Sequence, residues 1–467
     1  MAKEHFKRAD KRSLSFAISD LKNLFGNSFS TNDSILQSHG KDEAYHPVAP
    51  PDAVVFPKTN EEVKEAIKIC QKYSVPLIPF GVGTSLEGGV CALHGGVSID
   101  FSEMNRVLEV NYEDMDCRVE AGVTRKQLNN YLKNSGLFFP VDPGADATIG
   151  GMAATSASGT NAVKYGTMKD NVMGLTVVMA DGEIINTGGR ARKSSAGYDL
   201  TRLLVGSEGT LGVITEITLK LHGEPESISA AVCQFDNIED AVNVVINSFA
   251  SGVPLARIEL LDDLQMEACI NFSQLNEFKS LPTLFFEFHG SKDGVLEQTN
   301  IIQEISSEFG GHNFDWKNIP EERNRLWQAR HNAYYAAIAS KPGCEAWSSD
   351  VCVPITDLAS FIIETKKELE SLRLNAPLVG HVGDGNFHLL YLVDPDNQDE
   401  IKKAKDHNDK MVQKAIKLGG TCTGEHGIGY GKASSLALEA GSSINIMKSI
   451  KTALDPNGIL NPGKIFL

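Results

Sequence analysis

The chain has 467 residues, which is too many for one ordinary hydrophobic core, so two or three domains are expected. Its formal net charge of -16 argues against a nucleic-acid partner, because phosphates would be repelled over most of the surface. The eight cysteines show no CxxC spacing, and no apolar run approaches the roughly 20 residues of a membrane span. We therefore expect reduced thiols and a cytoplasmic protein without a clear targeting segment, mitochondrial if the source is eukaryotic.

The first predicted elements lead into a glycine-rich loop. Residues 1–45 are expected to form a helix and then irregular chain. A strand at 54–56, a helix that begins after Thr59 and a strand at 75–80 make a β-α-β unit. This unit delivers the chain into the loop 81–89.

The loop 81–89 follows a strand, as a phosphate-binding loop does. It lacks the GxGxxG pattern, because Leu86 stands where the third glycine belongs, and it lacks the Gly-Lys-Ser/Thr of a P-loop. A Rossmann nicotinamide site is therefore disfavoured. Two interpretations stay open: a nest of backbone N–H groups for a pyrophosphate, or a plain tight loop.

Two further segments are rich in small residues. Residues 142–161 carry mostly small side chains, and residues 206–214 contain three glycines before a predicted strand at 215–221. Small residues over such a length suit a backbone that lies flat along a large planar ligand. Three separated segments of this kind in one domain indicate one long, extended ligand better than any single segment does.

After residue 221 the pattern changes to strands and helices in turn. Such a pattern is typical of an α+β layer. We predict strands at 229–235, 256–261 and 283–288, and helices at 238–249, 295–309 and 356–371.

A histidine hairpin follows the last of these helices. The turn sequence Gly-Asp-Gly-Asn at 383–386 separates two apolar strand patterns, so a tight reversal brings His381 and His388 face to face. Two imidazoles so placed make half of a metal site. Asp384 in the turn either orients a ligand imidazole or only forms the turn.

A glycine-flanked loop at 423–429 supplies a carboxylate and another imidazole. Our hypothesis is that Glu425 joins His381 and His388 in holding a divalent cation, with His426 as the proton acceptor. Ligation by two nitrogens and one oxygen leaves positions open for a substrate, and it admits zinc, manganese, iron or cobalt. The alternative is that these histidines satisfy buried backbone groups and bind nothing.

Several of these motifs resemble those of a known flavoenzyme group. The glycine-rich segments resemble the FAD-binding motifs of the vanillyl-alcohol-oxidase fold, and with the histidine motifs and the C-terminal tail the chain closely resembles the FAD-linked D-lactate (D-2-hydroxyacid) dehydrogenases. The motifs that carry this resemblance lie at 79–85, 148–151, 206–212, 380–388, 424–429 and 455–464. The resemblance covers nearly the whole chain from about Pro47.

The resemblance implies an α+β, two-domain fold with an FAD-binding domain and an α/β cap domain for the substrate. The FAD-binding domain would take residues 1–222 and be completed by 423–467, and the cap domain would take 223–422 with the metal hairpin. No covalent flavin link is expected, since loops 81–89 and 142–161 contain neither histidine nor cysteine. The residues expected to bind FAD are Pro79, Gly81, Val82, Gly83, Thr84, Ser85, Pro143, Gly144, Thr148, Gly150, Gly151, Ala157, Gly159, Asn161, Tyr165, Glu208, Gly212, Ile214 and Asn461.

By the same resemblance, Arg330 anchors the substrate carboxylate and Asn386 donates a hydrogen bond to the substrate. A cation, zinc or manganese, would chelate a 2-hydroxy acid, His426 would take the hydroxyl proton, and a hydride would pass to FAD. The electrons would leave to an acceptor such as cytochrome c, a quinone or an electron-transfer flavoprotein. The resemblance also allows a homodimer.

The expected substrate is argued from the lack of a basic residue in one stretch of the chain. Relatives that oxidise D-2-hydroxyglutarate carry a basic residue in the stretch matching 347–351, where this chain has Ser348 and no Lys or Arg. Because an unpaired second carboxylate in a closed pocket would be costly, D-lactate fits better. Three alternatives stay open: another D-2-hydroxy acid such as D-2-hydroxyglutarate or glycolate, a flavin protein with a different role, and a flavin-free metallohydrolase that uses the His/His/Glu set.

Overall fold

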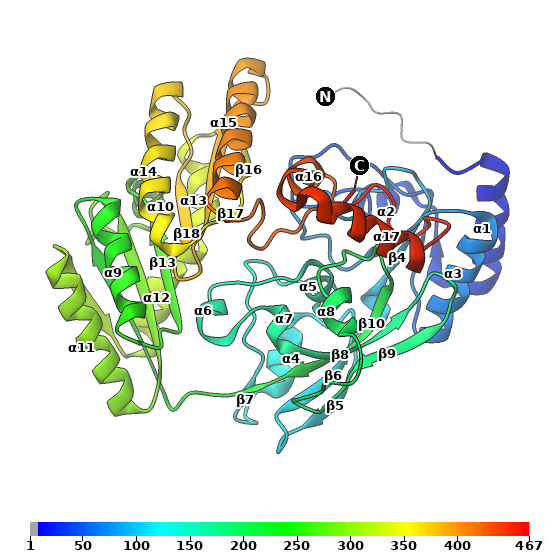
Figure 1. Cartoon of the computed structure of the whole chain (residues 1–467), viewed down its shortest axis with the longest axis horizontal. Coiled ribbons are helices and arrows are strands. Elements are labelled where there is room, and N and C mark those ends of the chain that lie inside the picture. The colour runs from blue at the N-terminus through cyan, green and yellow to red at the C-terminus, as the bar shows by residue number, and fades with distance from the viewer. Residues whose placement is uncertain (1–7, 467) are drawn as a thin grey trace. The chain divides into compact units, whose positions relative to one another are not determined.

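The chain forms two compact units and passes back and forth between them (Figure 1). The computed structural model describes residues 8–466. We call the two compact parts unit 1, with residues 8–158, 166–224 and 425–466, and unit 2, with Gly159–Tyr165 and Pro225–Gly424. Most of unit 2 is therefore an insertion into the chain of unit 1. The short segment Gly159–Tyr165, which stands between two parts of unit 1 in the sequence, also belongs to unit 2.

Unit 1 begins with the predicted β-α-β unit. Strands β2 and β3 pair in parallel with β4, which lies between them, and helix α3 forms the crossover. The buried side chains of α3 include Val63 and Ile67, and burying a side chain of this size contributes about 1.5–3 kcal/mol. The elements of this layer are α1 (Lys11–Phe25), β1 (Phe29–Ser30), α2 (Asp33–Ser38), β2 (Ala53–Val55), α3 (Asn60–Tyr73), β3 (Leu77–Phe80) and β4 (Val97–Asp100).

A second sheet of unit 1 is antiparallel, with strand order β5-β6-β10-β8-β9. Helix α5 packs against it. Within the small-residue segment 142–161, Thr148 caps helix α5, whose Ile149 and Met152 are buried in the core. These elements are β5 (Val107–Asn111), β6 (Asp116–Glu120), α4 (Arg125–Leu132), β7 (Leu137–Phe138), α5 (Ile149–Thr155), α7 (Met168–Asn171), β8 (Val172–Val178), β9 (Ile184–Gly188), α8 (Leu200–Leu204), β10 (Val213–Lys220) and β11 (His222–Gly223).

The C-terminal tail returns to the first sheet of unit 1. Helices α16 (Ala433–Ala440) and α17 (Ile444–Leu454) precede it, and Leu460 forms a parallel bridge with Leu77 of β3. Asp455 fixes the bend before the bridge by accepting hydrogen bonds from the backbone N–H groups of Ile459 and Leu460. Both ends of the described chain therefore build unit 1.

Unit 2 is built on one large sheet whose strands pair antiparallel. Its strand order is β15-β12-β14-β13-β18-β19-β16, and β17 also pairs with β19. The strands are β12 (Ser227–Gln234), β13 (Arg257–Leu261), β14 (Thr283–Gly290), β15 (His312–Lys317), β16 (Glu345–Ser348), β17 (Val351–Cys352), β18 (Leu378–His381) and β19 (Asn386–Val393). The helices are α6 (Ala162–Tyr165), α9 (Ile238–Ala250), α10 (Asp263–Ser273), α11 (Lys292–Glu308), α12 (Pro320–His331), α13 (Ala333–Ser340), α14 (Ile355–Leu372) and α15 (Gln398–Lys417).

The two faces of this sheet carry different helices. Leu261 and Val379 pack in one core cluster with residues of α10, α12 and α13. Phe387 points to the opposite face, where its ring meets Phe361 of α14 at 5.5 Å between centroids. Because side chains alternate along a strand, His388 lies on the α12 face of the sheet.

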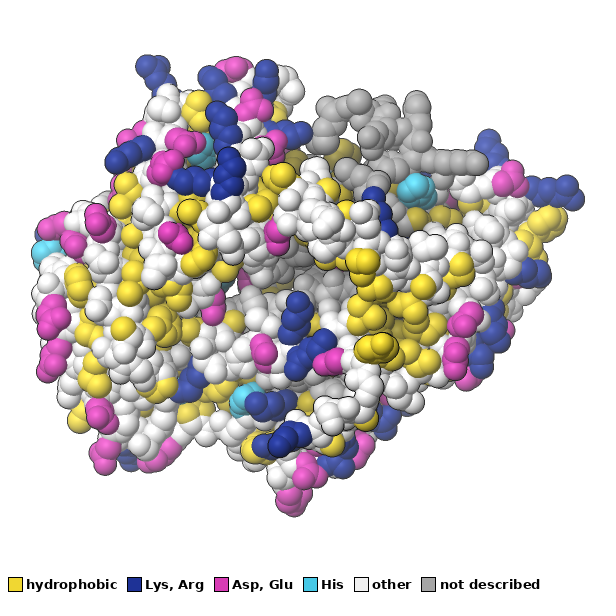
Figure 2. Space-filling model, viewed as in Figure 1, with side chains coloured by type: hydrophobic (Ala, Val, Ile, Leu, Met, Phe, Trp, Pro, Cys, Tyr) yellow, Lys and Arg dark blue, Asp and Glu magenta, His cyan; other side chains and the backbone are white. Residues whose placement is uncertain are grey.

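Charged side chains cover the outer helices of unit 2. Figure 2 shows Lys and Arg gathered over α14 and α15, where Lys402, Lys403 and Lys405 are exposed. Among residues 8–466, no helix is both long enough and apolar enough to cross a membrane.

Candidate active site

The three glycine-rich segments meet within unit 1. A Cβ atom on Gly81 would lie 2.3 Å from Thr148 Oγ1, so these two segments touch. The backbone N–H groups of Gly206 and Glu208 donate to the carbonyls of Ala153 and Ala154 at 2.9 and 2.8 Å. Three segments that are separate in the sequence thus pack against one another in unit 1.

Glu208 and Asn461 hold these loops together. The buried Glu208 carboxylate accepts hydrogen bonds from the backbone N–H groups of Ile428 (2.7 Å) and Gly429 (2.8 Å). Burial raises the pKa of Glu208 above its usual range, and the two N–H groups offset part of that rise. The Asn461 amide donates to the carbonyls of Glu208 (2.8 Å) and Gly89 (3.1 Å). Both side chains therefore fix the shape of the loops.

Most of the other residues predicted to bind FAD line these same unit 1 segments. Thr148 accepts a hydrogen bond from the N–H of Gly151 and begins α5, and Ile214 lies buried at the start of β10. Pro79 lies in β3, and the residues placed in the loops or in α5 are Gly81, Val82, Gly83, Thr84, Ser85, Pro143, Gly144, Gly150, Gly151, Ala157 and Gly212.

Three predicted FAD ligands lie in unit 2 instead, within Gly159–Tyr165. Asn161 Oδ1 accepts a hydrogen bond from Arg257 Nε at 2.8 Å, and Tyr165 Oη lies 2.7 Å from His289 Nδ1. Burial raises the pKa of Tyr165 to about 12. The side chains of this segment, which also contains Gly159, are thus bonded to the cap-domain strands.

The predicted histidine hairpin is present in unit 2. Strands β18 and β19 pair antiparallel, with His381 opposite Asn386 and Val379 opposite His388. The two imidazoles are therefore diagonal neighbours rather than direct partners, with ring centroids 5.3 Å apart. Gly385 in the turn has φ +76°, and a Cβ there would lie 2.0 Å from the carbonyl oxygen of Val353, so only glycine fits.

Both hairpin histidines have their tautomers fixed. His381 Nδ1 lies 2.7 Å from Glu259 Oε1, and His388 Nδ1 lies 2.9 Å from the carbonyl oxygen of Ser349. A carbonyl or carboxylate only accepts, so each Nδ1 carries the hydrogen and donates it. In the neutral ring the Nε2 atom then has the lone pair, which is the form that binds a metal ion.

Glu259 is the functional residue that the sequence analysis missed. It lies on β13, its side chain is 1% exposed, and it also accepts a hydrogen bond from Arg330 Nε at 2.8 Å, while Arg330 Nη2 forms an ion pair with the same oxygen at 2.6 Å. Burial raises the pKa of Glu259, but the charges and hydrogen bonds of His381 and Arg330 lower it more, so the net shift is downward. An acidic residue inside an apolar strand pattern was the available signal.

The side chain of Arg330 is mostly covered, whereas its helix neighbour Arg325 is exposed and pairs with Glu277 at the surface. The contacts with Glu259 use the Nε and Nη2 atoms of Arg330. A guanidinium has five N–H donors, so it can still present donors to a second carboxylate. Arg330 is thus placed on the same face of the sheet as His381, joined to it through one carboxylate.

Asn386 supports the loop that leads to Glu425. Its amide donates to Asp350 Oδ1 and to the carbonyl of Val351, both at 2.8 Å, which uses both N–H hydrogens. A Cβ on Gly424 would lie 2.2 Å from Asn386 Nδ2, so the chain runs directly against this side chain. Gly424 is the last residue of this part of unit 2, and Glu425 follows it in the chain.

The predicted turn residue Asp384 forms the bend of the hairpin. Its N–H donates to the carbonyl of His381 at 3.0 Å, and its own carbonyl accepts a hydrogen bond from Cys352 Sγ at 3.1 Å. These backbone contacts agree with a turn role and leave its part in orienting a ligand as a prediction.

The loop with Glu425 and His426 is shaped by unit 1. Ser158 Oγ donates to Glu425 Oε2 at 2.9 Å, and the two ring nitrogens of His426 lie 3.8 Å from Glu87 Oε1 and 3.9 Å from Glu425 Oε1. Lys432 Nζ lies 3.0 Å from the same Glu87 oxygen. The imidazole of His426 therefore lies between two carboxylates.

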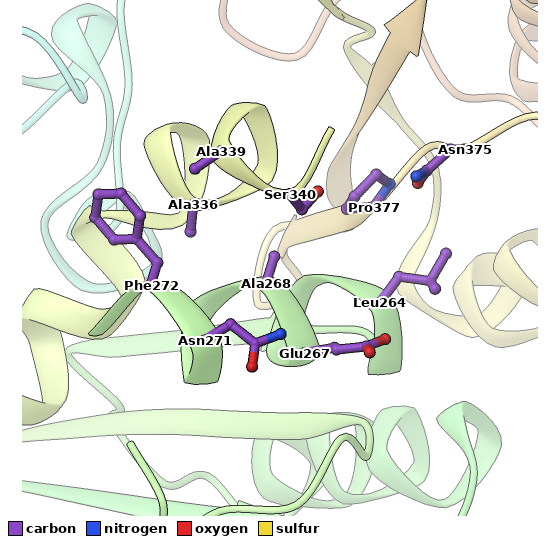
Figure 3. A pocket seen from close by; sticks show the side chains of 10 residues that line it. All are labelled: Leu264, Glu267, Ala268, Asn271, Phe272, Ala336, Ala339, Ser340, Asn375 and Pro377. Carbon is purple, nitrogen blue, oxygen red and sulfur yellow. The ribbon is translucent and has the colours of Figure 1, made fainter. Parts of the chain in front are cut away.

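A hollow in unit 2 lies away from these residues. A groove of about 520 Å³ runs between α10 and α13, lined by Leu264, Glu267, Ala268, Asn271, Phe272, Ala336, Ala339, Ser340, Asn375 and Pro377 (Figure 3). None of the predicted site residues lines it. The chemistry of the donor groups, and not the size of a hollow, therefore locates the candidate site.

Two family descriptions match this sequence. Residues 51–188 match the family described as FAD binding domain, and residues 224–465 match the family described as FAD linked oxidases, C-terminal domain. The second match alone covers more than half of the chain. The chain thus contains an FAD-binding domain, as the glycine-rich segments predict.

Curated relatives cover most of the chain. A probable mitochondrial D-lactate dehydrogenase of Danio rerio is 52% identical over 440 residues, which are 93% of this chain and 88% of the relative. A mitochondrial D-lactate dehydrogenase of Arabidopsis thaliana, named for cytochrome, is 47% identical over 96% of this chain and 79% of the relative. A glycolate oxidase subunit of Bacillus subtilis (strain 168) is 36% identical over 89% of each chain.

Solved structures share the fold at low sequence identity. The 4-ethylphenol oxidase of Gulosibacter chungangensis matches with a TM-score of 0.81 and 20% identity, over 98% of both chains. A p-cresol methylhydroxylase matches with a TM-score of 0.81 and 17% identity, over 98% of this chain and 97% of its own. The expected α+β fold of the vanillyl-alcohol-oxidase type is confirmed.

Proposed function

The chain belongs to the FAD-linked D-lactate dehydrogenases, and from this premise we infer that it oxidises D-lactate to pyruvate. The structural observation that carries the inference is the shared carboxylate of Glu259. It joins His381, a candidate metal ligand, to Arg330, a candidate anchor for a substrate carboxylate. A 2-hydroxy acid needs both groups close together, because its carboxylate and its hydroxyl are on adjacent carbons.

Unit 1 is the proposed holder of FAD, without a covalent link. The backbone surface made by 81–89, α5 and 206–212 supports this role, and Glu208 and Asn461 keep it in shape. His381, His388 and Glu425 are the proposed ligands of a divalent cation, zinc or manganese, because two neutral imidazoles and a carboxylate suit such an ion. When bound, FAD would accept the hydride from carbon 2 of the substrate, and the cation would polarise the substrate hydroxyl.

The protein side chains then have separate tasks. Arg330 orients the substrate carboxylate through its remaining N–H donors. His426 takes the hydroxyl proton, and Glu425 and Glu87 stabilise the imidazolium that results. Pyruvate leaves when its carboxylate separates from Arg330, and the electrons pass to an outside acceptor.

The stretch before His388 favours a monocarboxylate. The residues Ser348-Ser349-Asp350 provide hydroxyls and one buried carboxylate, and Ser348 Oγ bonds to the carbonyl of Ser349. A second substrate carboxylate at this place would meet Asp350 and find no cation, which costs free energy. D-Lactate is therefore the preferred substrate over D-2-hydroxyglutarate.

The names of relatives support a proposal for the electron acceptor and for the cellular location. Because the relative from Arabidopsis is named for cytochrome and for mitochondria, we propose a cytochrome acceptor and a mitochondrial or other oxidative setting for this chain. Reduction of cytochrome c by D-lactate in the presence of catalytic enzyme tests this acceptor against a quinone.

The experiment that tests the function is anaerobic flavin reduction with metal analysis of the same sample. D-Lactate should bleach the flavin absorbance at one equivalent, and L-lactate should leave it unchanged. Bleaching by glycolate or D-2-hydroxyglutarate in preference to D-lactate would reassign the substrate. A colourless protein with hydrolase activity would support a metallohydrolase instead, and a yellow pellet after acid precipitation would contradict non-covalent FAD.

A further inference from the structure

Glu259 is placed where one carboxylate can control two functional groups. Its Oε1 accepts a hydrogen bond from His381 Nδ1 at 2.7 Å, and its Oε2 accepts one from Arg330 Nε at 2.8 Å and lies 2.6 Å from Arg330 Nη2 in an ion pair. The three residues come from β13, α12 and β18, and all lie within unit 2. We propose that Glu259 is a positioning residue that sets the metal-binding tautomer of His381 and the orientation of Arg330 together.

The first half of this proposal concerns the ligand ring. A carboxylate that accepts from Nδ1 keeps the hydrogen on that nitrogen and makes Nε2 a better ligand. Loss of such a partner typically weakens metal affinity about 10–100-fold. His388 obtains the same help from the Ser349 carbonyl, which a side-chain substitution does not remove, so His381 is the ligand whose support can be tested.

The second half concerns the arginine. The side chain of Arg330 is 12% exposed, so little solvent competes with Glu259 for its donors. Two guanidinium nitrogens contact one oxygen, which fixes the plane of the fork. A planar fork held in one orientation loses less conformational entropy when it binds a substrate carboxylate.

Substitution with glutamine separates this role from simple packing. An amide of the same size has one acceptor oxygen and one NH₂ donor group. If the NH₂ faces His381, the ring must move its hydrogen to Nε2 and loses the ligand form. If the NH₂ faces Arg330, two donors meet and the guanidinium must turn away.

Unit 2 provides a matched control at Glu287. This carboxylate lies on the neighbouring strand β14, is buried, and also contacts a histidine and an arginine: His289 Nε2 at 2.8 Å and Arg257 Nη1 at 3.5 Å. Its substitution by glutamine damages a buried charge network of the same composition, away from the hairpin histidines.

The experiment measures Mn²⁺ and Zn²⁺ binding to FAD-loaded wild type, Glu259→Gln and Glu287→Gln, with the metal alone as the probe. Glu259→Gln should bind metal about 10–100-fold more weakly or raise the D-lactate KM at least tenfold, and Glu287→Gln should keep the wild-type metal affinity. Metal affinity and KM both within twofold of wild type in Glu259→Gln would overturn the proposal. Equal losses of metal affinity in the two variants would also overturn it, by showing general destabilisation.

A double-mutant cycle tests the coupling itself. The increase in D-lactate KM caused by Arg330→Met should be several-fold smaller in the Glu259→Gln background, because the arginine is then already misplaced. Independent effects would contradict the coupling. The inference rests on the proposed function, yet the failures are distinguishable: a wild type that binds no metal defeats the proposed cation site, whereas normal metal binding in Glu259→Gln with an unchanged KM defeats only the role of Glu259.

Discussion

Glu259 and Glu287 are two buried carboxylates in nearly the same setting. They lie on adjacent strands of one sheet, on the same face, and each contacts one histidine and one arginine. They differ in what the histidine meets on its other side. His381 lies 5.3 Å, centroid to centroid, from His388, whereas the second nitrogen of His289 bonds to Tyr165.

The comparison shows that the residue types of a buried Glu-His-Arg group do not by themselves determine what the group does. The neighbours of the group decide it. In both groups the carboxylate fixes the histidine tautomer and balances the arginine charge. Beside a second imidazole, the result is a candidate ligand set. Beside a phenol, the result is a clamp on the segment Gly159–Tyr165. Matching substitutions in the Glu259 group and in the Glu287 group test this distinction.

The largest contrast should come from the histidines. His388→Ala removes one proposed ligand, so we expect loss of the bound metal and a fall in D-lactate oxidation of about 10⁴-fold, with FAD retained. His289→Gln should keep its metal and lose stability instead. Metal analysis and flavin absorbance of both purified variants check this result, and full metal content in His388→Ala would break the comparison.

His426 belongs to neither group and tests whether the base lies outside them. Because general base catalysis contributes about 10²–10⁴-fold, His426→Ala should slow flavin reduction by that factor while FAD and metal stay bound. Anaerobic stopped-flow mixing with saturating D-lactate measures the rate. Lost metal would make His426 a ligand, and a wild-type rate would move the proton to another acceptor.

The arginines should separate substrate binding from stability. Arg330→Met loses a charged hydrogen bond to the substrate carboxylate, worth about 1.5–3 kcal/mol, so the D-lactate KM should rise by one to two orders of magnitude. Arg257→Met instead leaves Glu287 without its arginine, and we expect a lower unfolding temperature. KM values and thermal melts of both variants decide the assignment, which fails if Arg257→Met shows the larger KM.

The smallest expected effect is a change in acid sensitivity. Burial raises the pKa of Glu287, but Arg257 and His289 lower it more, so the net shift is below the usual 4.5. The unfolded chain then binds the proton first, and the stabilisation from Glu287, present above pH 4.5, is lost as the pH falls toward the folded-state pKa. Glu287→Gln should therefore lose less stability than wild type between pH 5 and pH 3. Parallel melting curves across this range would contradict the assignment.

Local patterns made much of the fold predictable. The β-α-β unit before 81–89, the antiparallel hairpin at His381 and His388, and the alternating strands and helices after residue 221 are all present. These features depend on nearby residues, such as a turn sequence between apolar strands. Helices α10 and α13, whose apolar residues show no strong helical repeat, were not predicted.

The contacts that complete the candidate site could not be predicted in this way. Glu259 meets partners that are 71 and 122 residues away in sequence, and nothing in a strand pattern identifies them. The same limit applies to Asn161 and Tyr165, which lie at and just after the end of the small-residue segment 142–161 yet bond to strands of unit 2. Polar groups that are far apart in the sequence become partners only in the folded chain. The local sequence around each group does not identify its partner.

The segment Gly159–Tyr165 affects how domains can be exchanged between this protein and its relatives by recombination. A cap domain coded by residues 225–424 alone would carry Arg257 and His289 without Asn161 and Tyr165, the groups they bond to. Recombination that transplants this domain into a related scaffold must therefore move two separate pieces of the gene together. A single-cassette swap would leave buried polar groups unsatisfied, at about 1–3 kcal/mol each, and a seven-residue graft should restore the loss.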